Sequence, residues 1–288
     1  KAGVDAFEGW EPIGNDTVKF TGIFNGNGNK ITNLWINRTS TNYVGLFGYI
    51  ENAQIKNLGV EAEEVKGYYY VGVIAGFVYE GAITNNYATG SVSATGNCVG
   101  GIVGYVSSNS TIKNSYAAGN VSGTGSSIGG IAGYIGESEI KNSYTTVDVS
   151  GTGSDIGGIA GYVYDAATIK NSYAAGDVSG INGVGGIAGT VYDSDVKNNA
   201  VVNPSVSGNS HTHRVVGRTN NLFHVSDNLA LTSMMITPSS SDADLNGANA
   251  TDTELKTKAT YEGLGWSFTD VWIMPAGGGY PILQWQQP

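Results

Sequence analysis

The stretch IGGIAGYIGESEIKNSYTTVDVSGTGSD (128–155) decides the fold of this 288-residue chain, because it is one copy of a repeat. Its opening segment recurs in altered form at five other places. The six segments are VGLFGYI (44–50), VGVIAGFV (71–78), VGGIVGYV (99–106), IGGIAGYI (128–135), IGGIAGYV (156–163) and VGGIAGTV (184–191). Their starts lie 27, 28, 29, 28 and 28 residues apart. A fixed period near 28 predicts that each repeat is one supersecondary unit stacked on the next.

Within a repeat, short apolar runs rich in Val, Ile and Tyr alternate with Gly, Asn, Ser and Asp, which is typical of strands and turns. The copy at 128–155 is interpreted as three short strands, IGGIAGYI, IKNSYTT and VDVS, separated by corners. A propeller blade would need four strands and a longer repeat, and the leucine spacing of a leucine-rich repeat is missing. We therefore predict an all-β fold, a right-handed parallel β-helix of about six to seven coils of ~28 residues, with a small C-terminal α+β cap.

Three columns of aliphatic residues are predicted to face the core, because strand side chains alternate with period two. They are Leu46, Ile74, Ile102, Ile131, Ile159 and Ile187; Ile50, Val78, Val106, Ile135, Val163 and Val191; and Ile55, Ile83, Ile112, Ile140, Ile169 and Val196.

A column of asparagines lies two residues beyond the third aliphatic column, with the same parity. Its members are Asn57, Asn85, Asn114, Asn142, Asn171 and Asn198. We expect a stacked, inward-facing amide ladder with a structural role at a corner, because buried polar groups need hydrogen-bond partners. A column of tyrosines at 87, 116, 144 and 173 shares this parity and is expected to pack toward the core.

An aromatic column is predicted to point outward, and its members are Tyr49, Phe77, Tyr105, Tyr134 and Tyr162, with Thr190 interrupting the pattern. Two interpretations stay open. The rings could pack on one another as cross-strand pairs that stabilise the stack. They could also form an exposed strip that binds a ligand, such as the flat face of a sugar.

Charged columns are sparse. Lysines recur at 56, 113, 141, 170 and 197, with acidic residues at the preceding corner to neutralise them. Asp148 and Asp177 fall in one outward column and are weak candidates for Ca²⁺. The motif His211-Thr212-His213, with His224, lacks nearby ligands to complete a zinc site, so no resident cofactor is predicted.

Composition narrows the classes of function. The net charge of −10 argues against nucleic-acid binding, and no apolar run is long enough to span a membrane. Charged residues make up only 13%, so Ser, Thr, Asn and Gly must dominate the exterior, as on secreted β-solenoids. A single cysteine, Cys98, excludes an internal disulfide framework. We expect an extracellular or cell-surface protein from which a signal peptide or lipid anchor has been removed.

Three regions are predicted. Residues 1–43 form a first, irregular coil that caps one end, 44–230 form the repeats, and 231–288 form a C-terminal cap. Thr251 to Glu254 has capping-box spacing and predicts a short helix after a loop at 239–250. The aromatic-rich stretch 265–285 is interpreted as strands that cover the last coil.

The repeats resemble the GLUG-motif family of bacterial surface proteins. The motif stands as Gly45-Leu46-Phe47-Gly48 and, in drifted form, as Gly-Ile-Ala-Gly at 130–133, 158–161 and 186–189. The segments around 12–34 and 264–285 are similar to those that flank such repeats in Bacteroides-type gut bacteria. The resemblance implies an adhesin-like surface protein and supplies no catalytic residues, although similar repeats adjoin immunoglobulin A peptidases.

These patterns favour a non-catalytic adhesion module whose partner is a glycan or an extracellular protein. One alternative is a carbohydrate-active β-helix, a polysaccharide lyase or glycoside hydrolase, which would use clustered acidic residues. The other is a spacer whose only role is reach.

Overall fold

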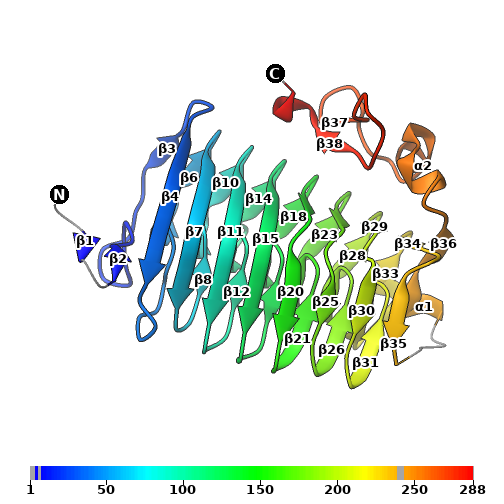
Figure 1. The fold of residues 1–288 in the computed structure, drawn as a ribbon, viewed down its shortest axis with the longest axis horizontal. Helices are drawn as coiled ribbons and strands as arrows, with labels where there is room; N and C mark the ends of the chain where they lie inside the picture. Colours follow the sequence, from blue (N-terminus) through cyan, green and yellow to red (C-terminus); the bar gives the residue numbers. More distant parts are fainter. Residues whose placement is uncertain (1–3, 6–7, 239–242, 288) are drawn as a thin grey trace.

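The computed structural model describes residues 4–5, 8–238 and 243–287, and over these ranges the chain is a parallel β-helix with a C-terminal segment folded against it (Figure 1). One sheet receives a single strand from each coil and has eight strands, so the described part of the chain holds eight coils. The prediction of six to seven was low. The first and last coils depart from the repeat in sequence, yet Phe24 pairs with Ile55 and Val225 pairs with Val196 in the regular register.

Four sheets run along the axis. The largest has the strands β1 (Val4–Asp5), β2 (Gly9–Trp10), β4 (Lys30–Asn37), β7 (Gly59–Gly67), β11 (Tyr87–Ala94), β15 (Tyr116–Gly123), β19 (Tyr144–Thr145), β20 (Asp148–Gly151), β24 (Tyr173–Ala174), β25 (Val178–Ser179), β29 (Ala200–Val201), β30 (Ser205–Ser207), β34 (Leu229–Leu231), β35 (Met235–Thr237) and β36 (Ala248–Ala250). The eight-stranded sheet has β3 (Ile23–Asn25), β6 (Gln54–Lys56), β10 (Ala82–Thr84), β14 (Thr111–Lys113), β18 (Glu139–Lys141), β23 (Thr168–Lys170), β28 (Asp195–Lys197) and β33 (Val225–Ser226).

The two remaining axial sheets follow one another in each coil. The first has β8 (Val71–Gly72), β12 (Val99–Gly100), β16 (Ile128–Gly129), β21 (Ser154–Gly157), β26 (Asn182–Gly185) and β31 (Ser210–His213). The second, called the strip sheet below, has β5 (Phe47–Glu51), β9 (Ala75–Tyr79), β13 (Val103–Ser107), β17 (Ala132–Gly136), β22 (Ala160–Tyr164), β27 (Ala188–Tyr192) and β32 (Val216–Thr219).

The predicted strand IGGIAGYI is in fact two strands in different sheets, β16 and β17, with a corner at Gly130-Ile131. The cause is close contact between coils. An ideal Cβ on Gly130 would lie 2.2 Å from the carbonyl oxygen of Gly158, the equivalent residue of the next coil. Only glycine allows the backbones to approach this closely.

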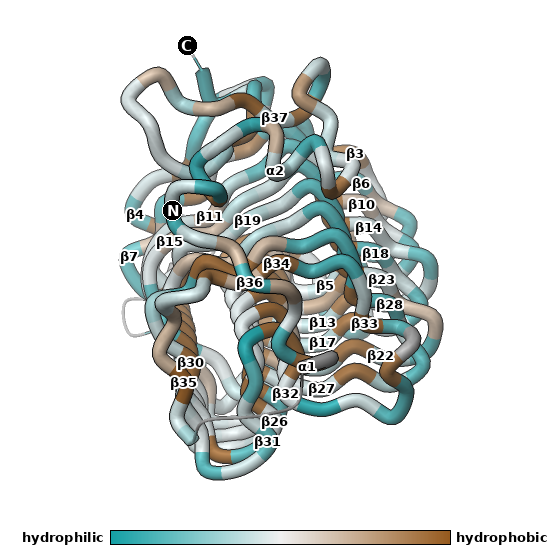
Figure 2. Tube along the Cα trace, turned by 90° about the vertical axis from the view of Figure 1, so that its right-hand side faces the viewer, coloured by the Kyte–Doolittle hydropathy of each residue, from teal (hydrophilic) through white to brown (hydrophobic). Residues whose placement is uncertain are grey.

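The three predicted aliphatic columns are confirmed as the core. Their members are between 0 and 2% exposed, and the strands pair identical positions, as Ile112 does with Ile83 and Ile140. Figure 2 shows hydrophobic residues recurring in line from coil to coil along the axis. At the N-terminal end, the partly buried residues Trp10, Ile13, Phe20 and Phe24 pack against this core.

The asparagine column differs from the prediction in its direction. All six residues have left-handed backbone, with φ between 49° and 57°, and they are half-buried. Their amides form a ladder, in which Nδ2 of Asn85, for example, donates to Oδ1 of Asn57 at 3.2 Å. Because a left-handed residue interrupts strand alternation, the asparagine and the residue two further on both face outward.

From Asn85 onward, the residue after each asparagine is polar and fully buried, and these residues form a second ladder: Asn86, Ser115, Ser143, Ser172 and Asn199. The backbone N–H of Ser115 donates to Oγ of Ser143 at 3.2 Å, and that of Ser143 donates to Oγ of Ser172 at 3.1 Å. These hydroxyls satisfy the corner amides that would otherwise lack partners in the core.

The C-terminal segment does not cover the last coil as predicted. It contains η2 (Glu254–Lys256), α2 (Lys258–Gly263), β37 (Trp272–Ile273), β38 (Ile282–Leu283) and η3 (Gln284–Gln286), and it runs back along the flank of the β-helix (Figures 1 and 2). The end of the solenoid carries instead α1 (Ala243–Asn246) and β36, after η1 (Leu222–His224) in the preceding coil. The predicted loop at 239–250 lies partly outside the described residues. The capping box is present, since Thr251 and Glu254 each accept a hydrogen bond from the other's backbone N–H.

Cys98 offers a direct test of the packing. Cys98 is 7% exposed, and burial raises the pKa of its thiol to about 12. At pH 8 the thiolate should therefore be roughly a thousandfold scarcer than for a free cysteine. We expect a thiol reagent such as DTNB to label the native protein only at the rate of unfolding, and the denatured protein at once. Rapid stoichiometric labelling of the native protein would contradict this placement.

Candidate functional site

The outward aromatic column is a continuous half-buried strip on one sheet. Tyr49, Phe77, Tyr105, Tyr134 and Tyr162 occupy equivalent positions on β5, β9, β13, β17 and β22. From Phe77 to Tyr162, successive ring centroids lie 4.6, 4.3 and 5.5 Å apart, with interplanar angles of 6°, 5° and 10°. The rings thus cover one another's faces, and the strip presents edges and hydroxyls to solvent.

Burial raises the pKa of Tyr105, Tyr134 and Tyr162. These hydroxyls therefore stay protonated through the physiological range, and the strip is an uncharged surface that can both donate and accept hydrogen bonds.

Further aromatic residues widen the strip at its two ends. Tyr43 and Tyr70 pack beside Phe77 at one end, with centroids 5.9 and 5.6 Å from it. At the other end Tyr164 and Tyr192, both exposed, stack at 5.7 Å.

The strip stops at Thr190, where a polar network replaces the ring. Thr190 Oγ1 donates to Oδ1 of Asp155, and Arg218 binds both residues, with Nε to Thr190 at 2.8 Å and an ion pair to Asp155 at 2.9 Å. A shallow pocket of about 300 Å³ opens here beside Tyr162 and Tyr192.

A second aromatic ladder, which sequence reasoning assigned to the core, lies on the flank of the β-helix. Tyr87, Tyr116, Tyr144 and Tyr173 stack with centroids 5.2, 5.0 and 4.8 Å apart. The C-terminal segment covers the last two, and its Trp272 is 0% exposed against them. The aromatic content of 265–285 was a signal that this segment needs aromatic partners, but nothing in the repeats identified which ones.

The first half of this ladder remains open in a groove of about 530 Å³ that we call the flank groove. Tyr87, Tyr116 and Trp285 line it with Asn57 and Asn85. The Trp285 indole Nε1 donates to the backbone carbonyl of Asn114 at 2.9 Å.

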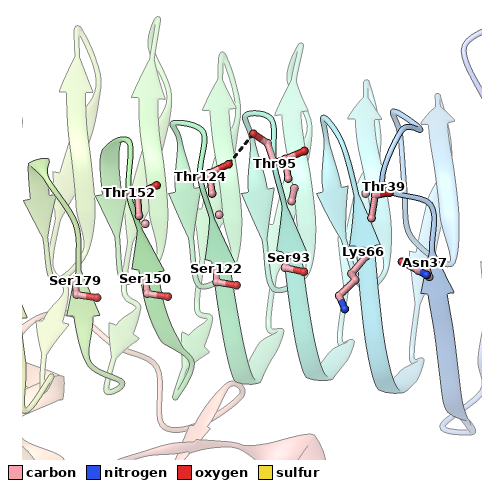
Figure 3. A pocket seen from close by; sticks show the side chains of 14 residues that line it. Asn37, Thr39, Lys66, Ser93, Thr95, Ser122, Thr124, Ser150, Thr152 and Ser179 are labelled. Carbon is pink, nitrogen blue, oxygen red and sulfur yellow. Dashed lines mark hydrogen bonds between the residues drawn. The ribbon is translucent and has the colours of Figure 1, made fainter.

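A long trough of about 670 Å³ crosses the coils on another face. Figure 3 shows its two rows of hydroxyls. The first row comprises Ser93, Ser122, Ser150 and Ser179, continued by Lys66 and Asn37; the second comprises Thr39, Thr95, Thr124 and Thr152. The column between the two rows holds only small residues, which are Gly67, Ala94, Gly123 and Gly151. The trough exists because no large side chain fills this column.

The weak calcium candidates make backbone and hydroxyl contacts. Oδ1 of Asp148 accepts from the backbone N–H of Asp177 at 2.9 Å, and Oδ1 of Asp177 accepts from Ser205 at 2.7 Å. His211 is hydrogen-bonded through Nδ1 to Oδ1 of Asn182, and His213 is hydrogen-bonded through Nδ1 to the Gly217 carbonyl. Over the described ranges, no three His, Cys, Asp or Glu side chains gather as a metal site would require.

The lysine column is partly neutralised, as its spacing predicted. Glu139 bridges Lys141 and Lys170, and Asp195 pairs with Lys197 at 2.6 Å and with His224. Burial opposes ionisation of Glu139, but the hydrogen bonds from the two lysines outweigh it and lower the pKa of that carboxyl.

Comparison with known proteins identifies a repeat motif and a shared fold. The GLUG motif matches residues 95–122 and 152–179. A "Putative Gly-rich membrane protein" of Evansella cellulosilytica is 46% identical over 81 residues, and the "Halomucin" of Haloquadratum walsbyi is 39% identical over 106 residues. These matches take in 27% and 35% of this chain but only 9% and 1% of those relatives. Among the described residues, no helix is both long enough and apolar enough to cross a bilayer.

The fold itself has a solved counterpart. A crystal structure described as a "putative immunoglobulin A1 protease" from Bacteroides ovatus superposes with a TM-score of 0.69 at 24% sequence identity. The superposition covers 96% of this chain and 95% of that one, so the two share the β-helix and its C-terminal segment. The chain therefore carries GLUG-type repeats, and these repeats are coils of a parallel β-helix.

Proposed function

We propose that this chain is a non-catalytic binding module of an extracellular surface protein, and that it recognises a glycan or an extracellular protein. The observation that carries the proposal is the strip. Uncharged aromatic side chains occupy the same outward position from Tyr49 to Tyr162, and Tyr43, Tyr70, Tyr164 and Tyr192 widen the surface. A continuous, partly exposed aromatic surface of this extent is typical of an interaction site.

The scaffold suits binding because it is rigid. Every strip residue sits on a strand that is hydrogen-bonded on both sides and backed by the aliphatic core, so little side-chain entropy is lost when a partner docks. The names of the relatives, a membrane protein and a halomucin, support a place at the cell surface.

The test is binding of the purified chain to an array of host glycans, bacterial polysaccharides and matrix proteins, with and without calcium. Changing Tyr105, Tyr134 and Tyr162 together to Ser should lower the affinity for the bound ligand at least tenfold, or by about 1.4 kcal/mol. Stacked pairs also stabilise the fold by about 0.5–1.5 kcal/mol each, so circular dichroism and melting must show that the variant is folded at the assay temperature.

Tyr68→Ser is the matched control, because Tyr68 is also exposed but lies outside the strip. Equal binding by the triple variant and the wild type would remove the strip as the site. A blank array with the fold intact would favour a spacer, and turnover of a polysaccharide on the array would favour the carbohydrate-active alternative.

A further inference from the structure

The flank groove is a composite site, since repeats and C-terminal segment both contribute to it. Tyr87 and Tyr116 come from β11 and β15, and Trp285 comes from η3, more than 160 residues later in the chain. We propose that this groove binds a short segment of an uncharged glycan, with the exposed Trp285 indole as the platform for a pyranose ring and the edges of Tyr87 and Tyr116 beside it. The proposal rests on the binding function above and names a different site for it.

The aromatic wall has a fixed orientation. The Trp285 indole is held by its hydrogen bond to the Asn114 carbonyl and packs on Tyr116 with centroids 5.9 Å apart, yet 37% of the residue remains exposed. Tyr116 is itself stacked on Tyr87 and Tyr144. An immobilised aromatic surface offers its electron-rich face to the C–H groups of a sugar ring at little entropic cost.

The asparagines of the lining supply hydrogen bonds. In the amide ladder, Asn85 donates one N–H to Asn57 and accepts one from Asn114, and Asn57 donates to Asn25. A primary amide has two N–H donors and an oxygen with two lone pairs, so each ladder amide retains one donor and one acceptor position. Both residues line the groove, one coil spacing apart, where sugar hydroxyls can use these positions.

The lining carries no charge at neutral pH, which selects an uncharged ligand. Burial first, and then the hydrogen bond to Glu61, raise the pKa of Tyr87 to about 12, so its hydroxyl stays protonated. The Glu61 carboxylate is occupied by Lys30 at 2.9 Å and by the Tyr87 hydroxyl at 3.0 Å. With a net charge of −10 on the chain, an acidic glycan would be repelled overall.

The size of the groove fits an oligosaccharide. It extends from the first-coil corner at Asn27 and Gly28 to Tyr116, which is three coil steps or roughly 14 Å. Its volume of about 530 Å³ lies within the range of small-molecule sites. A neutral chain lying along the axis would meet both the amides and the rings of the lining.

The experiment titrates neutral hexasaccharides of glucose, mannose, xylose and N-acetylglucosamine into the full chain, followed by calorimetry and by tryptophan fluorescence. At least one should bind with a change in indole emission. Trp285→Ala should weaken that binding at least tenfold. Trp285→Phe should retain part of the binding, because phenylalanine still offers a flat ring. The retention should be incomplete, because phenylalanine lacks the N–H that fixes the indole on the Asn114 carbonyl.

A second variant tests the groove without touching the C-terminal segment. Gly28 lines the groove with φ 78°, and no atom lies within 4 Å of an ideal Cβ there. Gly28→Asn should therefore place a side chain in the groove with less backbone strain than other substitutions, since asparagine tolerates left-handed backbone better than most residues. It should abolish binding and lower the melting temperature no more than the control below does. Gly278→Asn is the matched control, because Gly278 has φ 80° and the same open surroundings but does not line the groove.

The outcomes separate the two proposals. Loss of binding in Trp285→Ala and Gly28→Asn, with Gly278→Asn unaffected, supports the groove. Binding that survives both groove variants but is lost with the strip tyrosines overturns the groove and keeps the binding function. If no neutral hexasaccharide binds the wild type at millimolar concentration, the groove proposal fails, whatever the broader array shows.

Discussion

Replacing Gly158 with alanine should destabilise the β-helix by about 3 kcal/mol or more, at the upper end of what overpacking costs. An ideal Cβ on Gly158 would lie 2.0 Å from the carbonyl oxygen of Gly186 and 2.8 Å from Cβ of Ala174. The first of these atoms belongs to the backbone of the next coil, where the Gly186 N–H donates to the Arg214 carbonyl at 3.0 Å, so it cannot move aside without disturbing the stack. Thermal melting should show a midpoint lowered by roughly 5–10 °C.

Gly263→Ala is the matched control. Gly263 ends α2, and nothing lies within 4 Å of an ideal Cβ there. Alanine is also the better helix former, so stability should be unchanged or slightly raised. An equal loss in the two variants would show that coil contact at Gly158 is not the cause.

Trp272→Ala should release the C-terminal segment from the β-helix. Trp272 is fully buried and packs against Trp266 at 4.7 Å and against Tyr144 and Tyr173 at 6.2 and 6.1 Å. Truncating a buried tryptophan to alanine lowers stability by about 3–5 kcal/mol. A segment with little regular structure of its own should not stay docked after a loss of that size. Hydrogen exchange or limited proteolysis should show loss of protection over 251–287 while the strands of the repeats stay protected.

Trp272→Phe is the informative companion, because the Trp272 indole N–H is buried without a hydrogen-bond partner among the described residues. Phenylalanine keeps most of the ring and loses no hydrogen bond, so the segment should remain docked. If Trp272→Ala leaves 251–287 protected, the anchor must lie elsewhere, in the hydrogen bonds of Trp266 and Gln286.

The repeat predicted the architecture, but two local features escaped it. The periodicity correctly placed Ile112 in the core and Tyr105 on the outer face. Both residues lie in strands where side chains alternate regularly between the two faces. Alternation then failed at Asn114, whose left-handed backbone reverses the direction of each residue that follows within the corner. An asparagine recurring at a corner was a hint of this conformation, since it adopts positive φ more readily than other non-glycine residues.

The flank groove could not be predicted from the repeats, because contacts between Trp285 and Asn114 span 171 residues. Nothing in a local pattern determines which flank of a solenoid a terminal segment follows. Composition identified 265–285 as aromatic and in need of cover. Only the arrangement in space shows that Tyr144 and Tyr173 provide it, and that Tyr87 and Tyr116 are left open.

Identical positions pair from coil to coil, and this has a consequence for how such a chain changes over generations. Removing or duplicating a whole coil, such as 128–155, joins two surfaces that already match, with glycine facing glycine, amide facing amide and ring facing ring. A point mutation at Gly130 or Gly158 has no such compensation. Length is therefore the property that recombination between repeats can alter most freely, and a gene of this kind can lengthen or shorten its product while the cross-section stays constant.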